Sequence, residues 1–552
     1  MRLFLLMTIL AAAGSAKSLT DRFFDEYYFP YNPSGATSAG IHTYDGRLED
    51  FSRAAVRARV EILHKFEREF AAQPEDADRD LVLNYIRAAL LDLETIRSWQ
   101  RNPDNYSSGI AGSAFTIMSR TFAPPEARLK SLISRERAMP KMLMEARANL
   151  DNPPKIYTQI ALEQLPGIVA FFEHDVPLAF GQVKEAKVLD QFHASNAAVI
   201  AALKDYENFL RADLLPRSNG DFRLGAENFS KKLAYEEMVD IPLGRLLQIG
   251  FDDLRANQRR LKEVAAKIDP GKTPRVVLDD LEKDHPPADQ LLQAFRDECV
   301  KLRDFIVAKK IITLPSPVLP ILEETPPFAR ALTFASMDTP GPYEKVATQA
   351  YFNVTLPEKD WPAERVEDYM HSFNRGTILS TADHEAYPGH YVQFLWMQRV
   401  HSRVRKLLGA NSNAEGWAHY CEQMILDEGF SSDARMRLGQ LQDALLRDAR
   451  FIVGIEMHTG KMTMDQGVEF FEKEGYQPHE SALKETKRGT SDPTYLYYTL
   501  GKLQILKLRE DYRAMKGSQF SLEQFHDAFM QQGFPPIKIV RRALLGNDSP
   551  TL

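Results

Sequence analysis

The chain has 552 residues, of which 44% are apolar and 26% charged, and this ordinary globular composition argues against wholesale disorder and against a multi-span membrane protein. Lys and Arg number 69 and Asp and Glu 76, so the net charge of −7 gives no electrostatic footprint for nucleic acid or for an anionic membrane surface. The 2 Cys are too few for a disulfide framework.

The first sixteen residues have the pattern of a secretory signal. Arg2 precedes an uncharged apolar run that reaches Ala13, and small residues follow up to Ala16. The run is shorter than the ~20 residues of a membrane span, so the pattern favours export with cleavage near Ala16 over an N-terminal anchor helix. No Cys follows, which gives no support for a lipidated N-terminus. We therefore expect a periplasmic or extracellular mature chain without a membrane span.

Most of the remaining chain has the apolar spacing of amphipathic helices. The clearest stretches are 53–70, 81–99, 191–214 and 236–268. Three short β-favouring runs stand apart from this pattern, at 311–314, 331–334 and 351–356. The sequence thus predicts a mainly α fold with a small inserted sheet. Composition divides it into an N-terminal helical half at 17–305 and a C-terminal half at 306–552, which we expect to form one structural unit.

The segment from Asp383 to His390 carries the most informative motif. It begins His384-Glu385 and ends Gly389-His390, whereas the familiar zinc-hydrolase pattern H-E-x-x-H places its two His four residues apart on one helix face. A spacing of six residues puts the imidazoles ~120° apart on a regular helix. Pro388-Gly389 breaks or bulges a helix, and a local bulge that takes up two extra residues would return His390 to the side of His384.

A second group of polar residues follows on a helical stretch. Glu415, His419 and Glu422 share one stripe, opposite an apolar stripe that contains Trp417. Such a stripe can supply a third zinc ligand and a hydrogen bond to a ligating His. His384, His390 and Glu415 then provide the three protein ligands that a catalytic zinc site uses. The alternative is ordinary: a lone His-Glu pair is common, and Glu and His four residues apart usually form an exposed helix pair.

The order His-Glu-x-x-Pro-Gly-His, then Glu-Gly-Trp-Ala-x-Tyr-x-Glu, resembles the bacterial family called domain of unknown function 885. The resemblance continues in the opening segment 44–46 and in the closing segments 457–459, 487–488, 493, 498–502 and 508–509. That family is similar in motif order to the helical gluzincin peptidases. The resemblance implies a large bilobal helical body with a channel between its halves, one Zn²⁺ held by His384, His390 and Glu415, and Glu385 as the base that activates a zinc-bound water. His401 is an alternative ligand.

The resemblance also suggests roles for residues outside the two motifs. Related peptidases use a late Tyr or His to stabilise the oxyanion, so Tyr498 is the candidate and Tyr497 its alternate, against an ordinary core Tyr. The weaker candidates are oriented partners of the ligands or contacts to substrate, with structural salt bridges or core packing as the competing interpretation: Asp383, Glu422, His458, Arg488 and Arg509. The strand near Tyr351 is expected to pair with an extended peptide by edge addition.

Together these observations predict an exported zinc metallohydrolase of gluzincin type that cleaves short peptides. Two alternatives stay open. One is a zinc amidohydrolase that acts on a non-peptide amide, and the other is a non-catalytic helical envelope or binding protein. The sequence does not indicate the oligomeric state or the preferred peptide sequence.

Overall fold

The computed structural model describes residues 17–325, 330 and 334–552. Helices dominate these residues and one small sheet accompanies them, so the predicted mainly α fold with an inserted sheet is confirmed. The expected signal segment, 1–16, and most of the expected strand at 331–334 lie outside the described residues. In the described part, no helix combines the length and the apolar character that a membrane crossing requires.

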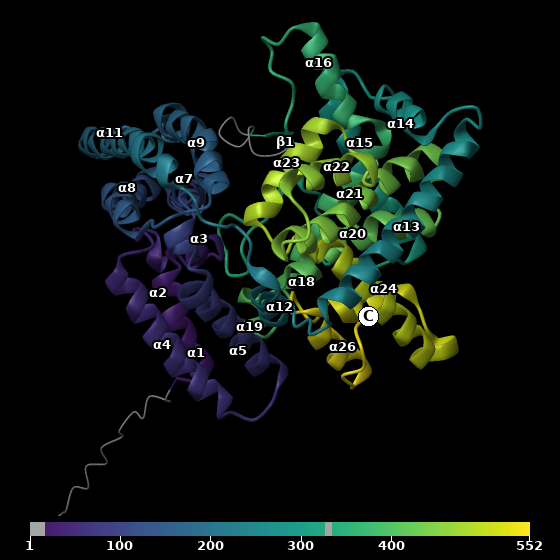
Figure 1. Cartoon of the computed structure of the whole chain (residues 1–552), viewed down its shortest axis with the longest axis horizontal. Coiled ribbons are helices and arrows are strands. Elements are labelled where there is room, and N and C mark those ends of the chain that lie inside the picture. Colours follow the sequence, from purple (N-terminus) through teal and green to yellow (C-terminus); the bar gives the residue numbers. More distant parts are fainter. Residues whose placement is uncertain (1–16, 326–329, 331–333) are drawn as a thin grey trace, which may run out of the picture.

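Figure 1 shows two lobes. The first lobe contains the N-terminal helices, which pack around two apolar cores. Side-chain caps begin several of them, as where the Ser52 hydroxyl accepts a hydrogen bond from the Ala55 amide. Its helices are α1 Leu19–Phe23, α2 Phe29–Tyr31, α3 Pro33–Ser38, α4 Arg53–Ala71, α5 Ala77–Leu90, α6 Ser98–Arg101, α7 Asp104–Met118, α8 Pro125–Asn149, α9 Lys155–Ala170, α10 Val176–Ala179 and α11 Ala186–Phe209.

The second lobe contains the sheet and the rest of the helices. It begins after residue 220, so helices that the composition assigned to the N-terminal half belong to it (Figure 1). Its helices are α12 Gly225–Glu236, α13 Leu243–Ile268, α14 Pro274–Glu282, α15 Leu291–Lys309, α16 Ala363–Met370, α17 Arg375–Glu385, α18 His390–Met397, α19 Arg403–Leu407, α20 Asn411–Asp427, α21 Ala434–His458, α22 Met464–Lys473, α23 His479–Ser491, α24 Tyr497–Lys516, α25 Leu522–Met530 and α26 Ile537–Leu545.

Two of the apolar cores contain residues from both sides of the predicted division at residue 305. Phe295 of α15 packs edge-on against Phe352 and Phe373, and all three belong to the core that also contains Trp417. A second core joins α12–α14 to α21 and the start of α24. Residues on both sides of 305 are therefore held together by shared apolar burial, which disfavours independent folding of the two predicted halves.

The sheet has three strands in the order β1-β3-β2. β1 (Ile321–Glu324) runs parallel to β3 (Tyr351–Val354), and β2 (Ala335–Asp338) runs antiparallel to it. The expectation of edge addition at Tyr351 is wrong, because β3 is the central strand and its two sides are already paired. An edge of the sheet is instead formed by β2. The run 311–314 is not a strand, and its Ile311 and Ile312 are buried in the core beside α15.

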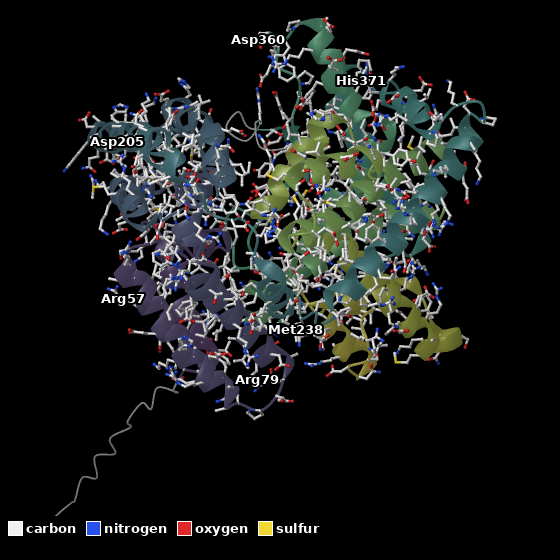
Figure 2. The ribbon with its side chains drawn as sticks, viewed as in Figure 1. Arg57, Arg79, Asp205, Met238, Asp360 and His371 are labelled. Carbon is white, nitrogen blue, oxygen red and sulfur yellow. The ribbon has the colours of Figure 1, made fainter. Side chains whose placement is uncertain are left out.

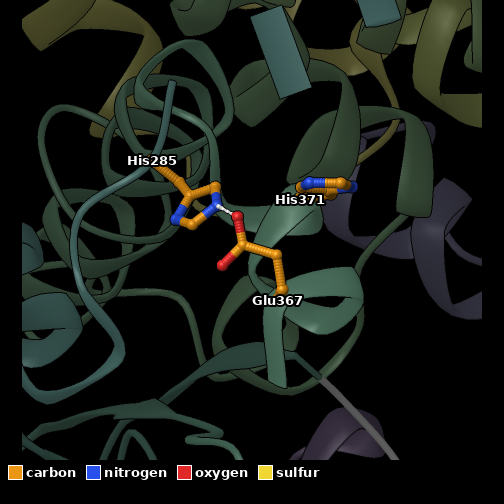
Figure 3. A group of neighbouring side chains, drawn as sticks. All are labelled: His285, Glu367 and His371. Carbon is orange, nitrogen blue, oxygen red and sulfur yellow. Dashed lines mark hydrogen bonds and ion pairs between the residues drawn. The ribbon is translucent and has the colours of Figure 1, made fainter. Parts of the chain in front are cut away.

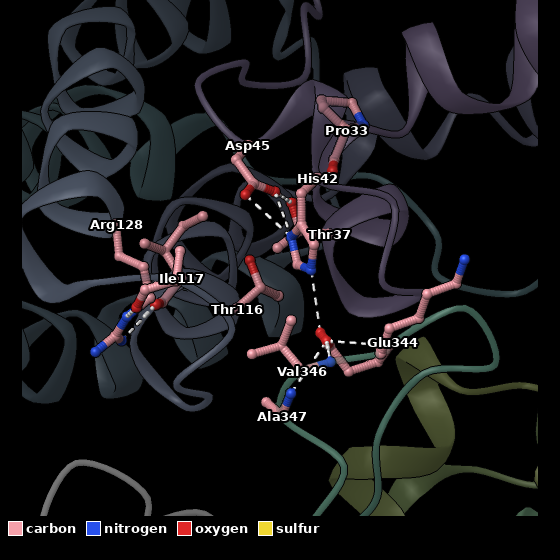
Figure 4. A network of polar contacts seen from close by, with 12 residues as sticks. Pro33, Thr37, His42, Asp45, Thr116, Ile117, Arg128, Glu344, Val346 and Ala347 are labelled. Atoms are coloured by element: carbon pink, nitrogen blue, oxygen red, sulfur yellow. Dashed lines mark hydrogen bonds and ion pairs between the residues drawn. The ribbon is translucent and has the colours of Figure 1, made fainter.

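A polar network joins the connection between β2 and β3 to the first lobe (Figure 4). His42 Nε2 lies 3.0 Å from Glu344 Oε2, and His42 Nδ1 lies 3.1 Å from Asp45 Oδ2. The other Glu344 oxygen accepts backbone N–H bonds from Val346 and Ala347. The hydrogen bond to Asp45, together with the contact to Glu344, raises the pKa of His42. Sequence-distant segments of the two lobes are thus held by charged groups as well as by apolar packing.

Candidate metal centre

The two histidines of the central motif lie on two different helices. His384 is the penultimate residue of α17, and His390 is the first residue of α18. Between them the Gly389 amide donates to the Asp383 carbonyl over 2.9 Å. The chain approaches itself so closely here that a Cβ at Gly389 would lie 1.8 Å from the His384 carbonyl oxygen. The structure therefore has the helix break and not the bulge: the six-residue spacing is accommodated by ending one helix and starting another.

The break brings both imidazoles to the same carboxylate. Glu415 Oε2, on α20, lies 3.4 Å from His384 Nε2 and 3.5 Å from His390 Nε2. The ligand-type atoms of the three residues all lie within 4.8 Å of one another. α20 can approach because Gly416 faces Gly501 of α24, where a Cβ on Gly416 would lie 2.5 Å from the Gly501 Cα. The glycine of the Glu-Gly-Trp-Ala motif thus sets the position of Glu415.

Hydrogen bonding decides which atoms of this cluster remain available. His384 Nδ1 donates to Glu422 Oε1 over 2.7 Å, so in the neutral imidazole Nε2 carries a lone pair. That lone pair faces Glu415 Oε2, a buried acceptor without a hydrogen-bond donor among the described residues. Acceptors at this distance repel unless a cation lies between them. Either protonated imidazoles or a metal ion must therefore balance Glu415.

The donor set and its spacing fit zinc. Two imidazole nitrogens and one carboxylate oxygen are ligands of catalytic zinc sites, and tetrahedral bonds of ~2.0–2.2 Å separate adjacent ligand atoms by about 3.3–3.6 Å. The two measured separations from Glu415 Oε2, 3.4 and 3.5 Å, fall in that range. Without a metal, burial raises the pKa of Glu415 but the imidazoles of His384 and His390 outweigh it and hold the pKa well below its ordinary value.

Glu422 is the buried carboxylate that supports the cluster from behind. Besides His384 Nδ1, it accepts from Arg447 Nη2 at 2.8 Å and from His419 Nδ1 at 3.1 Å. Burial raises the pKa of Glu422, but the Arg447 charge and these hydrogen bonds keep it below its ordinary value. Burial lowers the pKa of His419 to about 3, so this imidazole is neutral. The predicted orienting role fits Glu422, whereas both Asp383 oxygens lack hydrogen-bond partners in the described part of the chain.

Glu385 faces a cavity of about 490 Å³ beside the cluster. Its Oε2 accepts a hydrogen bond from the backbone amide of Met337, in the edge strand β2, over 3.1 Å. Residues 334–498 supply the whole lining. The cavity therefore belongs to the second lobe and does not lie between the helical halves, where the resemblance placed a channel.

Tyr498 lines the same cavity and is surrounded by guanidinium groups. The Cζ atoms of Arg450, Arg447 and Arg488 lie 4.9, 5.7 and 5.9 Å from its ring centroid. The Tyr497 hydroxyl is engaged elsewhere, since it donates to Asp492 Oδ2 and accepts from Arg488 Nη2, each over 3.2 Å. Of the two predicted tyrosines, Tyr498 is the one at the cavity.

Three further candidates lie apart from the cluster. His458 Nε2 contacts the Gly489 carbonyl at 2.8 Å and its Nδ1 accepts from the Leu224 amide, so both ring nitrogens serve the core. Arg509 donates to the Tyr420 hydroxyl, on the apolar side of α20. His401 is exposed in the link between α18 and α19. The structure does not bring any of the three to the cavity, whereas Arg488 lines it.

A second group of ligand-type side chains lies at the surface, near the top of the second lobe (Figures 2 and 3). His285 Nε2 lies 3.2 Å from Glu367 Oε1, and His371 lies beside them. In this outer group the Glu367 side chain is 62% exposed and that of His285 10%, whereas the side chains of His384, His390 and Glu415 are 11, 13 and 26% exposed. The outer group thus has a solvent-exposed carboxylate, whereas all three side chains of the inner group are largely buried, so the inner group is the candidate metal centre.

Sequence reasoning missed Met337, Arg447 and Lys484, which also line or support the site. None of them belongs to a local motif. Met337 contributes only its backbone, and Arg447 and Lys484 lie on helices whose patterns are those of ordinary amphipathic helices. The sequence-level signal for them is absent, because their positions depend on how separate elements pack.

The fold and this inner cluster define a mainly α-helical protein with a buried His-His-Glu group beside a polar cavity. The chain belongs to the family described as "Bacterial protein of unknown function (DUF885)", whose model matches residues 33–544. No curated protein matches it.

Two solved structures are similar over nearly the whole chain. One, from Shewanella oneidensis, is described as "a putative lipoprotein of unknown function"; it has 26% identity and a TM-score of 0.81, and the match covers 96% of this chain and 100% of that one. The other, from Colwellia psychrerythraea and also described as a "putative lipoprotein", has 18% identity and a TM-score of 0.81, with 95% and 98% covered.

Proposed function

We propose that the chain is an exported zinc-dependent metallohydrolase of gluzincin type that cleaves peptide bonds in short peptides. The observation that carries this proposal is the convergence of three acceptor atoms, His384 Nε2, His390 Nε2 and Glu415 Oε2, next to a cavity that Glu385 lines. Such a constellation of ligands, base and cavity is what metal-assisted hydrolysis requires.

Each residue would contribute a separate part of the chemistry. His384, His390 and Glu415 would hold the ion, which when bound supplies a Lewis acid for the substrate carbonyl and makes hydroxide available at neutral pH. Glu385 accepts the proton of the attacking water and delivers it to the leaving amine. The Met337 amide fixes the Glu385 carboxylate, which keeps it oriented toward the cavity. The Tyr498 hydroxyl donates a hydrogen bond to the developing oxyanion.

Export to the cell envelope is part of the same proposal. The charged start and apolar run of residues 2–13 support it, and so do the two similar bacterial structures, each described as that of a "putative lipoprotein". A zinc hydrolase of short peptides in that compartment would act on peptides that reach the envelope.

The test is metal analysis and peptide-library cleavage by the purified mature chain, wild type against Glu385→Gln. We expect one zinc per chain and a loss of about 10²–10⁴-fold in rate for the variant. Glu364→Gln, a substitution in the first turn of α16 and outside the cavity lining, is the matched control. Equal cleavage by wild type and Glu385→Gln would contradict the role of Glu385 as the base. Absence of stoichiometric zinc in wild type would contradict the proposed metal site. Zinc without peptide cleavage would favour the non-peptide amidohydrolase or the binding protein.

A further inference from the structure

One cation in the wall of the cavity beside Glu385, Lys484, forms no ion pair in the described part of the chain. Its charged lining consists of Glu385, Asp443, Arg447, Arg450, Lys484, Glu485 and Arg488. Arg450 is neutralised by Glu485 through two hydrogen bonds of 2.7 and 2.8 Å, and Arg447 pairs with Glu422 at 2.8 Å. Lys484 has no carboxylate partner among the described residues. An ammonium at the cavity wall without an ion-pair partner favours an anionic group in the part of the ligand that reaches it.

Lys484 is placed for a ligand rather than for the protein interior. It lies on α23 with an exposed side chain, and its ammonium is 5.6 Å from the ring centroid of Phe334, which also lines the cavity. Phe334 is 48% exposed, so part of its ring is accessible to a ligand in the cavity. Cation and exposed ring together offer a charged contact and an apolar wall.

Arg488 adds a second cation on the same face of the helix. It follows Lys484 by one helical turn, so both side chains point to the same side of α23. Asp492 accepts from Arg488 Nε and Nη2 over 3.2 and 3.0 Å, which fixes the guanidinium plane, yet the side chain remains 36% exposed. A fixed guanidinium beside a lysine is a usual receptor for a carboxylate.

We propose that Lys484 and Arg488 form the subsite for the free C-terminal carboxylate of the peptide substrate, a proposal that rests on the proposed function. The edge strand sets the distance. Glu385 is anchored at Met337 of β2, and the subsite begins at Phe334, which directly precedes β2 and lies three residues away along the chain, a span of at most about 10 Å. An extended peptide fills about 10 Å with about three residues. The enzyme would accordingly release short C-terminal fragments of two or three residues and act from the carboxyl end of its substrate.

Binding is measured first, by calorimetry on the zinc-loaded full mature chain carrying Glu385→Gln, so that no turnover occurs. The ligands are one pentapeptide as the free acid, the same peptide as the C-terminal amide, and an amide whose last residue is Glu. We expect the free acid to bind about tenfold more tightly than either amide. Lys484→Met, an exposed change that leaves the core intact, should bring the acid to the affinity of the amide. Lys473→Met on the neighbouring α22, whose lysine pairs with Glu469 outside the cavity lining, should leave the difference unchanged.

Turnover provides the readout that a merely structural defect would not give. In the otherwise wild-type chain, Lys484→Met should raise KM for the free acid about tenfold with kcat within about twofold, and should leave the amide unaffected. Equal affinity of acid and amide, failure of both to bind, or retention of the difference in Lys484→Met would each overturn the subsite. Tight binding of the amide that ends in Glu would show that the subsite recognises an acidic side chain and not the C-terminal carboxylate. Because binding is read without catalysis, these outcomes are separate from a failure of Glu385 as the base.

Discussion

Glu422→Gln tests whether the buried carboxylate behind His384 sets metal affinity. Glu422 Oε1 accepts from both His384 Nδ1 and Arg447 Nη2, at 2.7 and 2.8 Å. A glutamine carbonyl oxygen can keep both of these bonds. Its amide would face His419 Nδ1, and the neutral His419 can present a lone pair there because its Nε2 has no partner among the described residues. The substitution therefore removes the charge with little change of shape.

Loss of that charge weakens the polarisation of His384 and leaves the Arg447 charge without its counterion. Changes at carboxylates that support ligating histidines usually cost 10–100-fold in metal affinity, which is about 1.4–2.7 kcal/mol. We expect Glu422→Gln to raise the zinc dissociation constant by that factor in a chelator-competition assay, with a lower apparent Tm because Arg447 is buried. The effect should be larger for Glu422→Ala, which leaves three donors unsatisfied.

The matched control is Asp427→Asn on the same helix. Asp427 is the last residue of α20, whereas Glu415 lies near the start of that helix. Its side chain is exposed and pairs with Arg437 at 2.6 Å. Its substitution should leave the zinc dissociation constant within about twofold. A Glu422→Gln protein that binds zinc as tightly as wild type, or an equal weakening in Asp427→Asn, would refute the role that the geometry assigns to Glu422.

Three other measurements follow from the same contacts. His390→Ala should abolish the binding of the single zinc ion, whereas His371→Ala, in the outer group, should retain it. Elemental analysis of both variants after dialysis measures this, and a second zinc ion lost only in His371→Ala would contradict the choice of the inner group as the metal centre. Tyr498→Phe should lower kcat about 10²–10³-fold with little change in KM, whereas Tyr497→Phe should not, and equal effects would remove the oxyanion role. For His42, whose folded pKa lies above its unfolded value of ~6.5, the ion pairs with Asp45 and Glu344 are fully present below that value and are lost as pH rises through the folded pKa. The apparent Tm of wild type should then fall between pH 6 and 9 about a degree or two more than that of His42→Gln, and parallel curves would contradict the network.

The fold class could be predicted from the sequence because long amphipathic helices have a regular spacing of apolar residues. The predicted helix 53–70 matches α4, Arg53–Ala71, almost to the residue. The sheet was harder, since a four-residue strand carries little pattern: β1 was not predicted, and 351–356 gave no sign that β3 is central. Pairing order depends on contacts between segments, which no local pattern records.

The candidate site divides in the same way. His384, Glu385, His390 and Glu415 stand in two local motifs, and the structure places them together. The geometry that brings them together could be predicted only in part. Pro388-Gly389 indicated a break or a bulge in the helix but not which of the two occurs. The partner of Glu385 is a backbone amide, which has no sequence signature at all. Arg488 and Arg509 looked equivalent in sequence, and only packing separates the one at the cavity from the one behind α20.

Charge balance distinguishes a divalent ion from protons as the counterion at the His384, His390 and Glu415 cluster. Glu415 and Glu422 contact the imidazoles, Arg447 balances Glu422, and Glu385 lies beside them at the cavity. Two negative charges then remain in a largely buried region, where an unbalanced charge is expensive. One divalent cation closes that balance with both imidazoles neutral, as ligation requires, whereas protons close it only by making both imidazoles cations. Zinc and protons compete for the same imidazole nitrogens, so zinc binding tightens as pH rises. Added zinc should accordingly raise the apparent Tm more at pH 8 than at pH 5.5, and a zinc effect that is equal at both would favour protons as the native counterions.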